Sequence, residues 1–81
     1  MLTRNLYLVK DLARLTGLSI ETIKYYLKIK LISEVGRSPE TNFRYFDDST
    51  IDRLNKIIEL RRRRYPISKI REFLDVKEAS N

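Results

Sequence analysis

The feature that most constrains this fold is a short glycine-containing turn between two amphipathic segments near the start of the chain. The turn, Thr16-Gly17-Leu18, contains a glycine that can adopt the left-handed backbone conformation in which helices end. Before it, apolar residues recur at helical spacing and predict a helix over residues 8–15: Leu8, Leu12, Ala13 and Leu15. Two short helices joined in this way form a helix-turn-helix, although the spacing alone is only moderately specific.

The second segment begins with residues that favour the start of a helix. Ser19 is well placed as an N-cap, and Glu21 lies in the first turn, where the helix dipole favours an anion. We expect this helix to cover residues 19–29, with Leu18 packing against it as a hydrophobic staple. Its buried face then carries Ile20, Ile23 and Leu27, with Tyr26 near the border. Its polar face carries Glu21, Lys24, Tyr25 and Lys28.

Residues that favour β-strands surround a group of turn formers after the second helix. They occupy segments 33–35 and 43–46, and between them lie Gly36, Pro39 and Asn42. This order predicts a β-hairpin, or wing, over residues 33–46, with a polar loop at its tip.

Two further helices are expected in the last part of the chain. Asp47 or Asp48 can cap a third helix that ends in the basic run 61–64, and Pro66 suits the first turn of a fourth. Their buried positions are Ile51, Leu54, Ile57, Ile58, Ile67, Ile70, Phe73 and Leu74. The predicted fold class is therefore a mainly α winged helix-turn-helix with four short helices and a two-stranded β-hairpin wing.

Composition narrows the range of functions. The chain has 81 residues, enough for a single domain with an ordered core at about 7–74 and a tail at 75–81 whose end frays, as does the N-terminal end. Its net charge of +6 favours a polyanionic partner. Because it has no cysteine and no histidine, we expect no disulfide, metal, cofactor or enzymatic activity. Without a signal peptide or a membrane-spanning apolar run, we expect a cytoplasmic protein with no membrane partner.

Four stretches of the sequence, in order, carry a family resemblance. The segments 11–26, 43–46, 51–54 and 67–74 resemble the helix-turn-helix, wing, third helix and fourth helix of the N-terminal domain of MerR-family transcription regulators. The resemblance covers nearly all of the expected ordered core. It implies sequence-specific binding of double-stranded promoter DNA by half of a dimer, with helix 19–29 in the major groove and the wing on the backbone.

The resemblance also assigns roles by position. Lys24 and Tyr25 match the family's basic and first aromatic positions on the recognition helix, Tyr26 matches the second aromatic, and Arg44 and Tyr45 match the wing contacts. Tyr26 is about as well explained by packing, and the basic run 61–64 by a solvated cluster at a helix end. The residues that we expect to contact DNA are Ser19, Glu21, Thr22, Lys24, Tyr25, Tyr26, Lys28, Arg37, Arg44, Tyr45, Arg62 and Arg63.

Three positions depart from the family pattern. Lys24 stands where arginine is usual, so bidentate base readout is weakened while phosphate binding is kept. Asn42 and Arg64 stand where glycine is usual. Asparagine tolerates the left-handed conformation but arginine does so less readily, so we expect the corner at Arg64 to be shaped differently.

Residues 75–81 could span only ~10 Å as a helix, too short for the family's dimerisation helix. We therefore expect either a domain of a longer regulator or a small protein that binds as a monomer or through another contact. A homodimer requires the longer chain or a different interface. Two alternatives stay open: an excisionase-like factor that bends DNA at a recombination site, and a DNA-targeting or interaction module of a larger protein such as a transposase.

Overall fold

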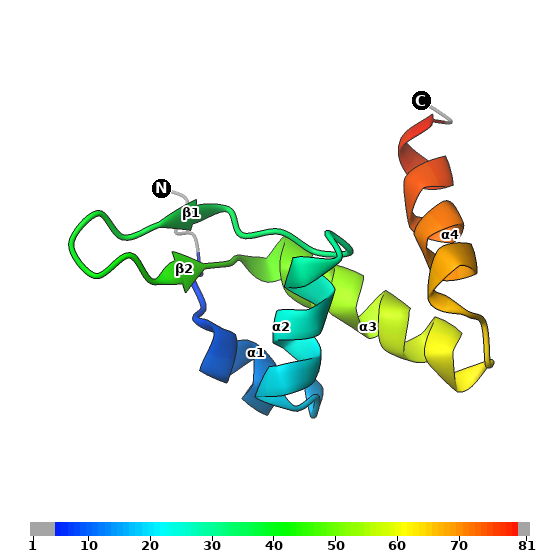
Figure 1. Ribbon diagram of the computed structural model, residues 1–81, viewed down its shortest axis with the longest axis horizontal. Coiled ribbons are helices and arrows are strands. Elements are labelled where there is room, and N and C mark those ends of the chain that lie inside the picture. Colours follow the sequence, from blue (N-terminus) through cyan, green and yellow to red (C-terminus); the bar gives the residue numbers. More distant parts are fainter. Residues whose placement is uncertain (1–4, 80–81) are drawn as a thin grey trace.

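Four helices and one antiparallel hairpin form the structure, which confirms the predicted fold class (Figure 1). The computed structural model describes residues 5–79, with side chains as far as Asp75, so the expected fraying of the two ends concerns residues outside this range. The elements are α1 (Val9–Thr16), α2 (Ile20–Lys28), β1 (Gly36–Arg37), β2 (Arg44–Tyr45), α3 (Asp48–Arg62) and α4 (Ile67–Ala79). Helix α4 thus continues beyond Leu74, where we expected the ordered part to end.

The turn between α1 and α2 is built as its sequence predicts. Gly17 has a φ of 82° and its amide donates to the carbonyl of Ala13 at 2.9 Å, which ends α1. The hydroxyl of Ser19 accepts a hydrogen bond from the amide of Thr22 at 3.0 Å and so caps α2. Both caps are local, which explains why the two helices begin and end within a residue of their expected bounds.

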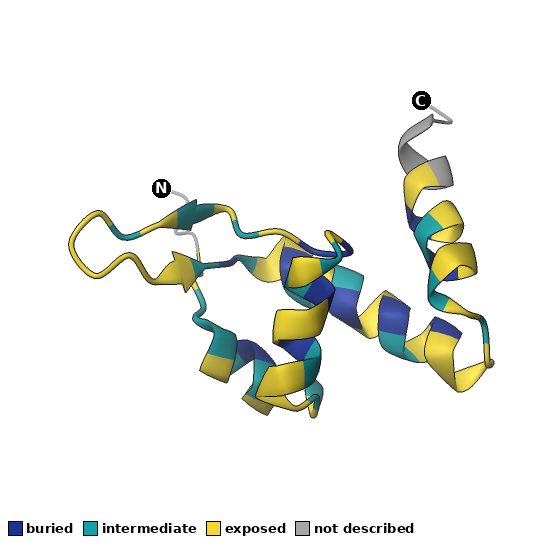
Figure 2. Cartoon of the chain, viewed as in Figure 1, coloured by how far each residue is buried: buried dark blue, intermediate teal, exposed yellow. Residues whose placement is uncertain are grey.

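The core lies where all four helices and the end of the wing meet (Figure 2). Its fully buried members include Leu12, Ile23, Leu31, Phe46, Leu54, Ile57 and Ile70. Three positions expected to be buried are instead exposed: Leu15 at 46%, Ile20 at 44% and Phe73 at 44%. Each stands at the edge of its helix's apolar stripe. The ring of Phe73 packs edge-on against Tyr65 at 5.0 Å.

The first strand of the hairpin lies later in the chain than expected. Strand β1 is Gly36–Arg37, so the expectation of a first strand at 33–35 with Gly36 in the turn is wrong. Gly36 pairs with Tyr45 and Arg37 with Arg44. The phenol of Tyr45 lies where a side chain on Gly36 would be, so any other residue at this position of the strand requires the Tyr45 ring to move.

The N-terminal segment joins the base of the wing. Tyr7 and Phe46 exchange backbone hydrogen bonds of 2.8 and 2.7 Å, so Phe46, predicted to extend the second strand, pairs with the N-terminal segment instead of β1. The phenol of Tyr7 donates to Asp48 at 2.7 Å, and this hydrogen bond raises the pKa of Tyr7. The first residue of α3 is therefore hydrogen-bonded to the segment that precedes α1.

Within residues 5–79, three residues other than glycine adopt the left-handed backbone conformation: Lys30 (φ 65°), Asn42 (φ 62°) and Arg64 (φ 70°). The expectation that the corner at Arg64 avoids this conformation is wrong. The amide of Arg64 donates to the carbonyl of Arg61 at 2.8 Å and that of Tyr65 to Leu60 at 3.2 Å, so the chain turns as a glycine would allow. Such a conformation costs an arginine about 1–2 kcal/mol.

Two arginines close the C-terminal end of α2. Arg71 on α4 donates to the carbonyl of Ile29 at 2.7 Å and to that of Lys30 at 3.4 Å. Arg53 on α3 donates to the carbonyl of Leu31 at 2.7 Å. Ile29 is the C-cap of α2, and the carbonyls of Lys30 and Leu31 belong to the turn that follows it. The C-cap carbonyl has no partner within the helix and carries partial negative charge, so a cationic donor satisfies both needs. The end of α2 is thereby fixed to both C-terminal helices.

Replacement of Arg71 tests this connection. We expect Arg71→Ala to lower the free energy of unfolding by about 1–2 kcal/mol, because it leaves helix-end carbonyls without their charged donor. Urea denaturation followed by circular dichroism measures this. Lys69→Ala on the same helix is the matched control, since Lys69 makes only an exposed ion pair with Glu72 at 3.5 Å, and it should change stability by less than about 0.5 kcal/mol. Equal losses in both variants would contradict the capping role.

Candidate nucleic-acid interface

The outer face of α2 presents the polar residues that helical phase predicted. Glu21, Lys24, Tyr25 and Lys28 are all exposed, with Tyr25 at 51%. Among the residues that the structure describes, neither Lys24 nor Lys28 makes an ion pair. This face therefore offers free cations and an exposed aromatic ring on a helix of a size that fits a DNA major groove.

The first turn of α2 is less available than its middle. The hydroxyl of Ser19 donates to that of Thr22 at 2.8 Å in addition to capping the helix, and Thr22 is half-buried. These two side chains are engaged with each other. Tyr26, also expected among the contacts, is only 5% exposed and belongs to the core, so its packing role is the one that the structure supports.

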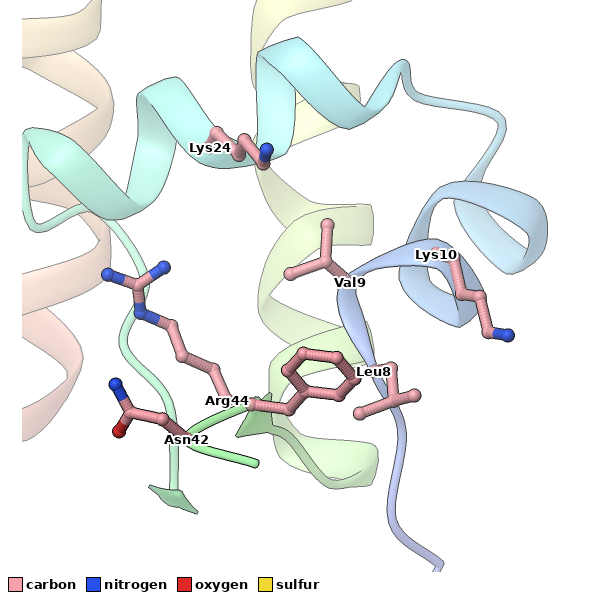
Figure 3. A pocket seen from close by; sticks show the side chains of 7 residues that line it. Leu8, Val9, Lys10, Lys24, Asn42 and Arg44 are labelled. Carbon is pink, nitrogen blue, oxygen red and sulfur yellow. The ribbon is translucent and has the colours of Figure 1, made fainter. Parts of the chain in front are cut away.

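An open groove of about 380 Å³ lies between the two helices of the motif and the wing (Figure 3). One wall is the start of α1, the second is α2 through Lys24, and the third is the returning strand of the wing. Figure 3 shows the side chain of Arg44 lying in the groove between the wing and α2. The lining residues are Leu8, Val9, Lys10, Lys24, Asn42, Phe43 and Arg44.

The groove combines positive charge with apolar surface. Lys10, Lys24 and Arg44 supply three cations from three different elements, and Leu8, Val9 and Phe43 supply the apolar part. Phe43 is 60% exposed, although phenylalanine is among the residue types most often buried in folded proteins. Sugar and phosphate alternate along a nucleic-acid backbone, and a surface of mixed cationic and apolar character complements both.

Five residues that line the groove were not among the residues expected to contact DNA: Leu8, Val9, Lys10, Asn42 and Phe43. Phe43 was expected only as part of a strand, and Lys10 was not singled out. Asn42 was noted only for its conformation. None of these residues carries a local pattern that indicates a site, because the groove exists only once the wing folds back beside α1.

The two arginines of the wing share one acidic partner. Arg37 donates to one carboxylate oxygen of Glu34 at 3.1 Å, and the Nε of Arg44 lies 3.5 Å from the other oxygen. A hydrogen bond from the backbone amide of Glu34, and then the one from Arg37, hold the pKa of this carboxyl below its usual value. Tyr45, the remaining wing residue expected to contact DNA, is half-buried against Gly36.

The basic run lies apart from the groove. Residues 61–64 are all exposed, and Figure 1 places the end of α3 on the opposite side of the molecule from the wing. Arg63 pairs with Glu59 at 3.2 Å, whereas Arg62 has no ion pair among the described residues. Arg62 and Arg63 therefore form a second cationic surface.

Within residues 5–79, no group of three or more acidic side chains is arranged to hold a metal ion. No helix in that range has the length and apolar character needed to cross a membrane.

The fold and the groove define a winged helix-turn-helix protein, and comparison with known proteins identifies its family. Residues 7–77 match the MerR HTH family regulatory proteins. Since this match covers most of the sequence, the chain belongs to the MerR family. A family of DNA-binding transcription regulators is not one of excisionases or transposase modules, so those two alternatives are not favoured.

Three curated relatives come from Bacillus subtilis (strain 168). The HTH-type transcriptional regulator CueR is 29% identical over 69 residues, which make up 85% of this chain and 47% of that protein. The multidrug-efflux transporter 1 regulator is 28% identical over 88% of this chain and 26% of its own length. The HTH-type transcriptional activator mta is 29% identical over 85% of this chain and 26% of its own length. This chain thus spans half or less of each relative's length.

The fit of Tyr45 over Gly36 predicts that the wing depends on this glycine. In Gly36→Ala, the added methyl group collides with the phenol, so we expect a loss of about 1–3 kcal/mol in stability and a displaced Tyr45 ring. NMR spectra of the ring protons measure the displacement. Gly17→Ala is the control, because its Cβ meets nothing within 4 Å and it destabilises only through its positive φ. Unchanged Tyr45 signals in Gly36→Ala would refute the prediction.

Proposed function

We propose that this chain binds double-stranded DNA in a sequence-specific way, with α2 in the major groove and the wing, residues 33–46, on the flanking backbone. The observation that carries the proposal is the groove of about 380 Å³ between α2 and the wing, which gathers Lys10, Lys24 and Arg44 beside apolar side chains. A phosphate seated there is attracted by three cations from three elements, so the groove fixes the orientation of the helix on the duplex.

The exposed face of α2 would then read the bases. Tyr25 offers a ring for a thymine methyl or a hydroxyl for a phosphate, and Lys28 a cation one turn from Lys24. Glu21 can accept from a cytosine amino group. Lys24 lacks the planar fork of arginine, so we assign it to phosphate or to a single guanine acceptor. Thr22 and Ser19, which are bonded to each other, have a supporting role at the helix start.

A second backbone contact is proposed for the end of α3. Arg62 and Arg63 are exposed there, and they would hold a more distant phosphate than the groove does. Promoter-type DNA and a dimer are part of the same proposal, supported by relatives that are transcription regulators. Two copies would place their α2 helices in successive major grooves, one helical turn or a multiple apart. A cytoplasmic location stays a prediction that goes with this partner.

A residue-resolved NMR titration with a short duplex is the direct test. We expect shifts concentrated in residues 22–28 and 37–45, with smaller ones at residues 8–10, because these line the proposed interface. Binding should weaken steeply with salt, with a slope that corresponds to about 4–6 neutralised phosphates. Shifts confined to residues 61–64, or affinity that is indifferent to salt, would mean nonspecific charge binding or another kind of partner.

Substitutions separate the interface from the core. We expect Lys24→Ala and Arg44→Ala to weaken duplex binding several-fold while the free energy of unfolding changes by less than about 0.5 kcal/mol, since both side chains are exposed. Ile23→Ala should lower the free energy of unfolding by about 2–4 kcal/mol, because Ile23 is fully buried. Fluorescence anisotropy and urea denaturation provide the two measurements. If all three variants unfold alike, the two faces of α2 have been assigned wrongly.

A further inference from the structure

Glu34 forms ion pairs with both arginines of the wing, Arg37 and Arg44. It precedes β1, and its two carboxylate oxygens face different partners: Oε2 lies 3.1 Å from Nε of Arg37, and Oε1 lies 3.5 Å from Nε of Arg44. The Glu34 side chain is 27% exposed, against 43% and 42% for the two arginines. The carboxylate is therefore the more sheltered member of each pair.

The same arginines are the wing's proposed phosphate ligands. A carboxylate and a phosphate oxygen offer a guanidinium the same kind of charge-assisted hydrogen bond, and a donor that points at one is withheld from the other. Each of these partly exposed ion pairs is weak on its own, so DNA can displace Glu34, but the two together reduce what the wing gains from doing so. The lowered pKa keeps Glu34 ionised at neutral pH.

We infer that Glu34 is an internal competitor of phosphate for Arg37 and Arg44, and that it limits how tightly the wing holds the DNA backbone. Because backbone contacts carry no sequence information, this competitor lowers affinity for every duplex alike. Contacts between α2 and the bases then contribute a larger share of the remaining binding free energy. The inference rests on the proposed function, since it assumes that the wing meets phosphate.

Glu40 provides a matched control on the same hairpin. It lies in the exposed loop at the wing tip and makes no ion pair among the described residues. Glu34→Gln and Glu40→Gln remove the same charge from the same wing and keep nearly the same shape. A general charge effect raises the affinity of both variants for DNA, whereas release of the arginines belongs to Glu34→Gln alone.

The experiment compares wild type, Glu34→Gln and Glu40→Gln by fluorescence anisotropy with a random-sequence 20-base-pair duplex at several salt concentrations. We expect Glu34→Gln to bind about 3–10-fold more tightly than Glu40→Gln, with a salt slope steeper by about one phosphate. Adding Glu34→Gln to an Arg37→Ala, Arg44→Ala background should remove this difference. Equal binding by the two glutamine variants, or weaker binding by Glu34→Gln, would overturn the inference; the latter result would make Glu34 a residue that positions the arginines for DNA.

A second measurement separates this inference from the proposed function. Inorganic phosphate is titrated into each protein without DNA, and the Nε–H signals of Arg37 and Arg44 are followed by NMR. We expect half-saturation at a several-fold lower phosphate concentration in Glu34→Gln than in wild type or Glu40→Gln. Wild type that fails to bind any duplex would refute the proposed function, whereas identical phosphate titrations in all three proteins would refute the competition itself.

Discussion

The orientation of α2 depends on the arginines that hold its C-terminal end. A helix that presents side chains to a partner must be fixed along its length, and packing of Ile23 and Tyr26 fixes only its inner face. The hydrogen bonds from Arg53 and Arg71 to the carbonyls of residues 29–31 add a fixed point at the end, where the chain leaves through a left-handed Lys30. Helices α3 and α4 therefore determine where the polar face of α2 points.

The wing depends on a different fixed point. Phe46 is fully buried and pairs through its backbone with Tyr7, so the returning strand is held at its base by the core and by the N-terminal segment. Alternation along the strand places Arg44 on the same face as Phe46, two residues away, and there Arg44 is exposed and lines the groove. One wall of the groove, α2, is held by Arg53 and Arg71, and another, the wing, is held by Phe46. The width of the groove consequently follows from the core rather than from the loop at the wing tip.

How far the sequence predicts this structure depends on how local each determinant is. Gly17, Ser19 and Asp47 act within a few residues of themselves, so the helices and the outward face with Lys24 and Tyr25 were predictable. The strand register was not, because it depends on Tyr45 covering Gly36 across the hairpin. The same holds for the exposure of Ile20 and for the groove position of Lys10, which is set by how α1 and the wing approach each other. These features depend on tertiary packing and leave no local pattern in the sequence.

The net charge of +6 alone would predict only a protein that adheres to polyanions. Several basic residues already have acidic neighbours, as in the exposed pairs of Arg14 with Asp11 and of Arg63 with Glu59. What distinguishes the groove is that its lysines are unpaired among the described residues, and that Val9 and Phe43 lie beside them. An exposed cluster such as residues 61–64 accepts any phosphate, whereas a groove with apolar walls admits the backbone in few orientations. Only a surface that restricts orientation can bring Tyr25 and Lys28 to the same base edges each time, so discrimination between sequences begins with the shape of the groove.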